Sequence, residues 1–264
     1  MRTDCKDAFR QLDFVVQDAR QEFPISEALV YEVIRQDGQH YLILQDGEPR
    51  ETGLGLKSFA YRLQWHIHGH VFGVIGEYTR VHGGCAEHDG NRILVVGDSG
   101  VGKTTLMTRL LYEGFRVHCD ELVMIRDGKA VPFPRRFHVK RDSLRLLPQI
   151  RPFIDDVPFV ESTGGAKIFA FSPSQAGFDW VIEDREARLV FFLESNHGAE
   201  TVVEECPKYL MVNKVMPLTF FSKARDHLKI GELCRVIDRA ACFVLRMGNL
   251  DSAVMAIRNH MAAL

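Results

Sequence analysis

The chain has 264 residues, of which 46% are hydrophobic and 26% charged, a composition typical of a globular protein with one large domain or with a small and a medium one. Its formal net charge of −2 excludes a broad positive field that would recruit nucleic acid or anionic lipid. The six cysteines are scattered without a C-x-x-C pair, which indicates reduced thiols and argues against a disulfide framework or a zinc site.

The N-terminal stretch "MRTDCKDAFRQLDFVVQDARQEF" carries mixed charge and has no continuous apolar segment, so it does not resemble a secretory signal. No later run approaches the roughly 18 apolar residues that a membrane-spanning helix needs. We therefore expect a cytoplasmic protein that binds neither membrane nor nucleic acid.

Residues 1–79 are expected to form a small N-terminal domain of mixed α and β structure. Apolar positions at helical spacing predict an amphipathic helix over residues 5–22. Those positions are Phe9, Leu12, Val15, Val16 and Ala19. The dipeptide Asp37-Gly38 predicts a hairpin of two strands. Residues 55–75 fit a helix or a strand equally well.

Residues 80–264 show a strand–loop–helix–strand order, which predicts an α/β architecture. The strand "RILVVGD" leads into a glycine-rich loop, and "KTTLMTRLLYEG" reads as a helix that ends at a glycine. A strand and a hairpin at Asp127-Gly128 follow, whereas residues 132–187 are rich in Pro and Gly and show no clear pattern. "ARLVFFLES" predicts a buried strand, and the C-terminal stretch predicts a helix, a strand and a closing helix.

The glycine-rich loop satisfies G-x-x-x-x-G-K-[ST], between a strand of β-branched residues and a helix. Its glycines let backbone N–H groups curl around an anion, and the helix N-terminus adds partial positive charge. Lys103 is expected to reach the β- and γ-phosphates, and the Thr104 hydroxyl to ligate Mg²⁺. The predicted cofactor-binding residues are Gly97, Asp98, Ser99, Gly100, Val101, Gly102, Lys103, Thr104 and Thr105.

A phosphate loop does not reveal the phosphate acceptor. Asn213-Lys214-Val215-Met216 lacks the aspartate of the guanine-specific N-K-x-D, and no D-x-x-G follows the loop, so a GTPase is disfavoured. Asp120 and Glu121 follow Lys103 by only one helix and one short strand. Adjacent carboxylates at that position suit two tasks, one at Mg²⁺ and one as base toward an acceptor hydroxyl. A solvated acidic turn at a strand end remains the alternative.

At this point the residues resemble a known family. "GDSGVGKTT" and "EGFRVHCDELVMI", with His82-Gly83 ahead of the loop, look like the catalytic domain of bacterial HPr kinase/phosphorylase. "PFPRRFHVK" and "CFVLRMGNLDSAVMAI" look more like the HPr-kinase-related proteins of biosynthetic clusters, which include kinases that phosphorylate a serine on lasso-peptide precursors. The resemblance covers about residues 80–264, densely only over 81–140, and residues 1–79 match nothing.

The resemblance implies a P-loop kinase domain of HPr-kinase/PEP-carboxykinase type that uses ATP and Mg²⁺. It implies that Asp120 is the general base on the incoming hydroxyl, assisted by His82, and that Glu121 holds Mg²⁺ or orients the base. The chain departs from HPr kinase in having Asp-Glu rather than Asp-Asp, and it lacks a recognisable Glu-Ile-Arg-Gly motif and HPr-binding C-terminal stretch. These departures speak against HPr as the substrate and against a phosphorylase activity.

Basic residues after the second hairpin offer charge for the transferred phosphate. Arg135, Arg136 and Lys140 lie in a segment that Pro132 and Pro134 would hold extended. A solvated basic loop is the alternative. We favour Arg135 as the catalytic arginine, because the family pattern has its arginine directly after the proline.

Three further stretches have structural explanations. His66, His68 and His70 would share one face of a strand, but no carboxylate or cysteine is nearby, which favours structural or surface roles over a metal site. The Phe-rich "VFFLES" and "LTFFSKA" predict core strand and packing. The "STGG" of residues 162–165 suggests a lid over the acceptor.

The leading hypothesis is an ATP- and Mg²⁺-dependent kinase whose partner is a peptide or protein bearing a serine hydroxyl. Asp120 would take the hydroxyl proton, Lys103 and the loop amides would hold the phosphates, and Thr104 would place the metal. One alternative is a small-molecule kinase acting, for instance, on free serine, and another is a non-catalytic nucleotide-binding regulator. A homo-oligomer is compatible with each hypothesis.

Overall fold

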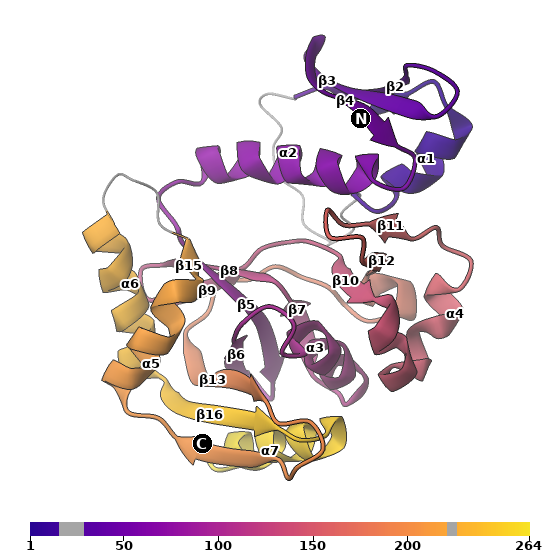
Figure 1. Cartoon of the computed structure of the whole chain (residues 1–264). Coiled ribbons are helices and arrows are strands. Elements are labelled where there is room, and N and C mark those ends of the chain that lie inside the picture. Colours follow the sequence, from indigo (N-terminus) through magenta and orange to yellow (C-terminus); the bar gives the residue numbers. More distant parts are fainter. Residues whose placement is uncertain (16–28, 221–225) are drawn as a thin grey trace.

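The computed structural model describes residues 1–15, 29–220 and 226–264. Within them a small sheet and a long helix lie above a large central sheet that is covered by helices on both faces (Figure 1). Helix α1 spans Lys6–Leu12 and is shorter than the helix expected over 5–22. The later half of that expected helix, from residue 16, lies outside the described residues.

The small sheet has four strands in the order β1-β2-β3-β4, where β1 is Arg2–Thr3, β2 is Tyr31–Arg35, β3 is His40–Gln45 and β4 is Glu48–Gly55. The predicted hairpin at Asp37-Gly38 is confirmed, because β2 and β3 pair antiparallel across it. A second turn, at Asp46-Gly47, adds β4; both of its residues have positive φ, at 52° and 85°. The ambiguous stretch after β4 forms a helix, α2, over Phe59–Val74.

The central sheet has the order β14-β16-β13-β6-β5-β8-β9, with β7 and β15 also paired to β5. Strands β6, β13 and β16 run parallel to one another, and β5 runs antiparallel to β6. The predicted α/β class is therefore confirmed for this part of the chain. The strand bounds are β5 Thr79–His88, β6 Asn91–Val96, β7 Arg116–Cys119, β8 Leu122–Arg126, β9 Lys129–Pro132, β13 Ala187–Ser195, β14 Val202–Glu205, β15 Thr219–Phe220 and β16 Ala241–Met247.

Alternate residues of β6 pack into two separate hydrophobic cores, because successive side chains of a strand point to opposite faces. Ile93 and Val95 pack in one core with helices α3, Lys103–Tyr112, and α7, Leu250–Ala262. Leu94 and Val96 pack in the other core with α5, Lys208–Val215, and α6, Asp226–Arg239. The sheet is thereby buried on both faces, as expected for parallel strands.

The segment that sequence patterns left unassigned builds a third, three-stranded sheet, in which β10, Phe137–Lys140, and β11, Val160–Glu161, flank β12, Lys167–Phe171. It also contains the short helices η1 Arg141–Leu146, η2 Pro148–Ile150, α4 Arg151–Ile154 and η3 Pro173–Ala176; a further short helix, η4, spans Met216–Leu218. Val160, Ile168 and Ala170 share a core with Phe59 and Leu63 of α2. The N-terminal residues and this sheet are therefore packed together, and the domain boundary near residue 80 remains a prediction.

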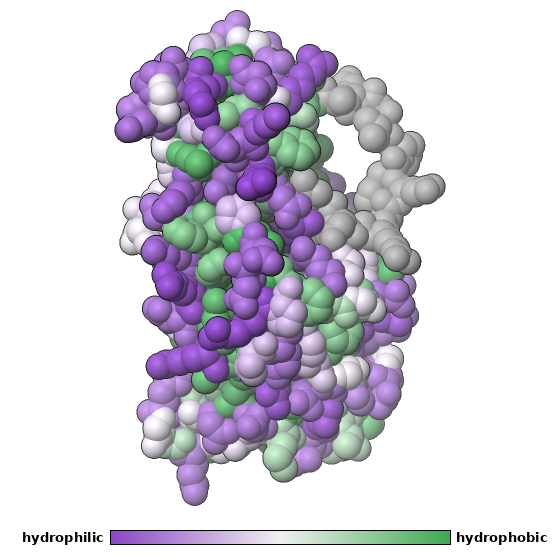
Figure 2. Space-filling view, turned by 90° about the vertical axis from the view of Figure 1, so that its right-hand side faces the viewer, coloured by the Kyte–Doolittle hydropathy of each residue, from purple (hydrophilic) through white to green (hydrophobic). Residues whose placement is uncertain are grey.

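The face seen when the molecule is turned by 90° mixes hydrophilic residues with scattered apolar ones (Figure 2). Such a mixture is ordinary for protein surface in contact with water. In the part of the chain that the structure describes, no helix combines the length and the apolar character needed to cross a bilayer.

His118 of β7 is a fully buried histidine that ties the chain near residue 180 to the central sheet. Its Nδ1 lies 2.7 Å from the carbonyl oxygen of Val181, and Trp180 donates from Nε1 to the His118 carbonyl at 2.6 Å. Burial, followed by the neighbouring Arg92 guanidinium, lowers the pKa of His118 to about 4. The imidazole is therefore neutral in the folded protein at neutral pH.

His118 should make the fold acid-sensitive. Between its folded pKa of about 4 and its ordinary value of 6.5, only the unfolded chain binds the proton, so stability falls as pH drops through this window. The full difference corresponds to about 3 kcal/mol. Denaturant titrations from pH 7 to pH 4.5 should show a shallower loss of stability for His118→Gln than for the wild type. Parallel curves would contradict this assignment.

Candidate functional site

The glycine-rich loop lies between β6 and α3, at the carboxyl end of β6 and beside the parallel strands β13 and β16. A Cβ at Gly97 would come 2.6 Å from the carbonyl oxygen of Leu193, and one at Gly102 would come 2.7 Å from Met247 Cε. Gly102 also has a φ of 101°, in the left-handed region. Gly97 is thus required by its close approach to the backbone of β13, and Gly102 by its left-handed backbone, because the Met247 methyl group could shift. The loop lies at the edge of the sheet where α/β proteins bind ligands.

Lys103 lies across this loop. Its Nζ donates to the carbonyls of Gly97 and Asp98 at 2.7 and 2.8 Å, and the residue is only 6% exposed. Burial lowers the pKa of its ammonium group. Of the other predicted loop residues, Ser99, Gly100, Gly102, Thr104 and Thr105 line a cavity of about 460 Å³, whereas Val101 packs against the core.

Asp120 is buried behind the loop. Thr104 donates from Oγ1 to Asp120 Oδ2 at 2.8 Å, whereas Asp120 Oδ1 is buried without a hydrogen-bond partner. The residue is 1% exposed and does not line the cavity. Burial raises the pKa of this carboxyl to about 6, although the Arg135 guanidinium opposes the change. The carboxyl therefore contacts Thr104 at the start of α3 and does not face the open cavity, where the expected base would have to be.

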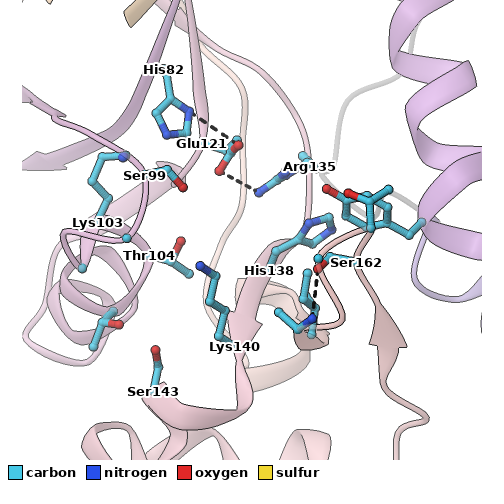
Figure 3. Close-up of a pocket in the computed structure, with 18 residues that line it drawn as sticks. His82, Ser99, Lys103, Thr104, Glu121, Arg135, His138, Lys140, Ser143 and Ser162 are labelled. Atoms are coloured by element: carbon cyan, nitrogen blue, oxygen red, sulfur yellow. Dashed lines mark hydrogen bonds and ion pairs between the residues drawn. The ribbon is translucent and has the colours of Figure 1, made fainter. Parts of the chain in front are cut away.

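Glu121 lies in the cavity itself. Its Oε1 is 3.5 Å from His82 Nδ1 and its Oε2 is 3.3 Å from Arg135 Nη2 (Figure 3). Burial favours the neutral carboxyl, but Arg135, His82 and Lys103 outweigh it, and the pKa of Glu121 lies below its ordinary value. The pKa of His82 is lowered, mainly by burial. The site therefore presents a charged carboxylate next to a neutral imidazole at pH 7.

Strand pairing explains why residues so far apart in sequence meet here. Strands β5 and β8 pair antiparallel with His82 opposite Leu122, and Gly83 donates its N–H to the Glu121 carbonyl at 3.0 Å. Phe133 donates its N–H to the Leu122 carbonyl at 3.0 Å. The chain therefore returns past the acidic pair, and Arg135 lies beside Glu121.

The structure distinguishes the two neighbouring arginines, of which the sequence analysis favoured Arg135. The Arg135 side chain is 11% exposed and lies between the two carboxylates, with Nη2 3.6 Å from Asp120 Oδ1. Arg136 contacts Asp13 instead, at 2.8 Å, away from the site. Arg135 therefore contacts both residues of the acidic pair, and the alternative that these segments are solvated loops is wrong.

Several residues that line the cavity were missed or only weakly indicated. Tyr61 comes from α2, whose pattern was ambiguous, and His138 and Ser143 come from the unassigned segment. Lys140 was named as a neighbouring cation and does line the cavity. Residues 162–164 of the "STGG" stretch also line the cavity. A lid over the acceptor would occupy this position, and its movement remains a prediction.

Two structural expectations need correction. His66, on a helix and not a strand, lies 2.9 Å from a Glu51 carboxylate oxygen, so a carboxylate is nearby after all. Within the described ranges, however, no group of three or more His, Cys, Asp or Glu side chains is arranged to hold a metal ion. Phe191 and Phe192 are buried as expected, but Phe220 is 51% exposed and is not core packing.

No family model matches the chain, and no curated protein matches it. Among solved structures, the HPr(Ser) kinase/phosphatase from Coxiella burnetii is similar over 70% of this chain and 97% of its own, at 12% identity and a TM-score of 0.36. This likeness is distant.

The buried Asp120 carboxyl should reduce the stability of the metal-free protein. Its pKa is raised from 3.8 to about 6, so its contribution to stability is complete below pH 3.8 and is lost as pH rises through 6. Asp120→Asn should therefore raise the free energy of unfolding at pH 7.5 in EDTA, by up to about 3 kcal/mol. Chemical denaturation would measure the gain. Asp98→Asn, which neutralises an exposed carboxyl of the same loop, is the matched control. A loss of stability on Asp120→Asn would refute the assignment.

Proposed function

We propose that the chain is an ATP- and Mg²⁺-dependent kinase that transfers the γ-phosphate to a serine hydroxyl of a peptide or protein. One observation carries the proposal: a single cavity contains the phosphate loop and, facing it, a charged carboxylate fixed by His82 and Arg135. Phosphoryl transfer requires positioned phosphates, positive charge and a proton acceptor for the incoming hydroxyl, and this cavity offers all three.

Lys103, the loop N–H groups and the start of α3 would hold the phosphates. The Lys103 ammonium now donates to loop carbonyls and would exchange them for phosphate oxygens. Arg135 would provide a second cation at the transferred group. Its Nη2 lies beside the two carboxylates, whereas its Nε is buried without a hydrogen-bond acceptor and is a donor that a phosphate oxygen could use.

The residues present fit Mg²⁺. Thr104 Oγ1 and the Asp120 carboxylate are hard oxygen ligands 2.8 Å apart, and Asp120 Oδ1 is buried without a hydrogen-bond partner, with the Arg135 guanidinium 3.6 Å away. When bound, Mg²⁺ would neutralise charge on the phosphate oxygens. We therefore assign Asp120 to the metal and Glu121 to the hydroxyl, which exchanges the roles that the sequence resemblance implied.

Glu121 would accept the proton of the serine hydroxyl as the serine oxygen bonds to the γ-phosphorus and the bond to the β–γ bridging oxygen breaks, releasing ADP. Its lowered pKa keeps it ionised and ready to accept at neutral pH. His82, neutral and beside Glu121, would orient the carboxylate toward the acceptor.

The two carboxylates should be separable by mutation. Glu121→Gln should lower the rate of phosphate transfer about 100-fold or more, while ATP binding in Mg²⁺ stays unchanged. Asp120→Asn should weaken the Mg²⁺-dependent part of ATP binding by about tenfold or more. Calorimetric titration of ATP with and without Mg²⁺, beside a phosphate-transfer assay, measures both effects. If Asp120→Asn abolished transfer with ATP binding intact, Asp120 and not Glu121 would be the base.

The acceptor class is decided by offering two substrates in parallel. Serine-containing peptides and free serine are incubated with ATP and Mg²⁺, and products are identified by mass spectrometry. A phosphorylated peptide is the expected result. Phosphoserine formed only from free serine would indicate a small-molecule kinase, and ATP binding without a product in either reaction would indicate a nucleotide-binding regulator.

A further inference from the structure

A second cavity, of about 370 Å³, adjoins the phosphate cavity on the side of α2. The two cavities share a boundary formed by Tyr61, His82, Glu121, Arg135 and His138. The proposed base therefore stands at the junction, with the phosphate loop on one side and the second cavity on the other. An acceptor that presents its hydroxyl to Glu121 would place its remaining atoms in the second cavity.

Most of the wall of this cavity is aromatic. The rings of His68, Phe72 and Phe133 contact one another with centroids 5.1 to 5.8 Å apart. Burial lowers the pKa of His68 to about 4, so this ring is neutral at pH 7. Trp65 and Phe220 also line the cavity, and both are more than half exposed, at 61% and 51%. The apolar wall thus extends from a buried floor to the protein surface.

One buried polar side chain interrupts this wall. Gln64 is 4% exposed and lines the cavity, and its Nε2 has no hydrogen-bond partner. A buried donor without an acceptor is unfavourable in the free protein and is satisfied when a ligand supplies an oxygen. The main-chain carbonyl of a peptide supplies such an oxygen, whereas a hydrocarbon group does not.

Building on the kinase function proposed above, we propose that the second cavity binds an aromatic or large aliphatic side chain adjacent to the acceptor serine of a peptide. Gln64 donates to a main-chain carbonyl of the same peptide. A peptide, and not a small alcohol, is favoured because the wall of exposed aromatic rings continues to the surface, where a chain can leave the site. Apolar pockets with a few placed polar groups are the usual form of such recognition.

Trp65 makes the binding measurable without turnover. The chain has two tryptophans, and the other, Trp180, is 1% exposed in the core, so a change of emission on peptide binding reports on Trp65. The full chain, with ADP and Mg²⁺, is titrated with capped pentapeptides that carry a central serine and no Trp or Tyr. Phe, Leu, Ala or Glu stands directly before or directly after the serine.

Peptides with Phe or Leu beside the serine should bind about tenfold or more tighter than those with Ala or Glu, in at least one of the two positions. In the transfer assay the same preference should appear in KM and not in kcat. Equal affinities, or a preference for Glu, would overturn the proposal. Transfer to serine that ignores the neighbouring residue would do so as well, while leaving the kinase function intact.

Three variants locate the effect. Phe220→Ala removes an exposed ring and should weaken binding of the Phe peptide but not of the Ala peptide. Gln64→Leu should weaken every peptide to a similar degree, since it acts on the main chain. Val74→Ala is the control and should leave the affinity of every peptide unchanged. Val74 lies on α2, like Gln64, but it is 70% exposed and outside the cavity. Selective binding of Phe peptides without any transfer would support this cavity and refute the kinase.

Discussion

The hydrogen bond from the Thr104 hydroxyl to the buried Asp120 carboxylate is the contact on which the site depends. It joins the first turn of α3, which follows the glycine-rich loop, to the residue after β7, and so fixes where the acidic pair lies relative to that loop. Asp120 and Glu121 form the bend between β7 and β8, in which the Asp120 side chain is buried and the Glu121 side chain lines the cavity. One carboxylate is thus held beside Thr104, and its neighbour faces the cavity.

The carboxyl groups of Asp120 and Glu121 lie in different electrostatic surroundings. Asp120 is buried, one of its oxygens has no hydrogen-bond partner, and burial raises its pKa, whereas Glu121 is partly exposed and nearby cations lower its pKa. Adjacent residues on one strand end thus acquire opposite shifts because one faces the interior and the other faces Arg135 and His82. Paired titratable groups in contrasting environments are a usual sign of divided roles in catalysis.

The sequence predicted those parts of the molecule that local chemistry dictates. The strand, glycine-rich loop and helix around residues 91–112, the hairpins at Asp37-Gly38 and Asp127-Gly128 and the buried strand over residues 187–195 all follow from short patterns. Strand pairing across distant segments is not encoded locally, so the contact of His82 with Glu121 was not predicted; the resemblance paired His82 with Asp120 instead. Which of two neighbouring carboxylates faces the cavity depends on the fold around the bend, and the sequence alone does not determine it. The unassigned segment around residues 132–187 lacks a regular pattern because its strands are short and its helices have few turns.

The core shared by α2 and the third sheet bears on how the molecule can be divided. Val160, Ile168 and Ala170 are covered by Phe59 and Leu63, and the chain between β11 and β12 forms part of the phosphate cavity. A fragment that starts at residue 80 would expose these apolar side chains to water and remove the packing beneath one wall of the cavity. The amino-terminal residues therefore support the cavity, and a variant that lacks them should be less stable than the full chain.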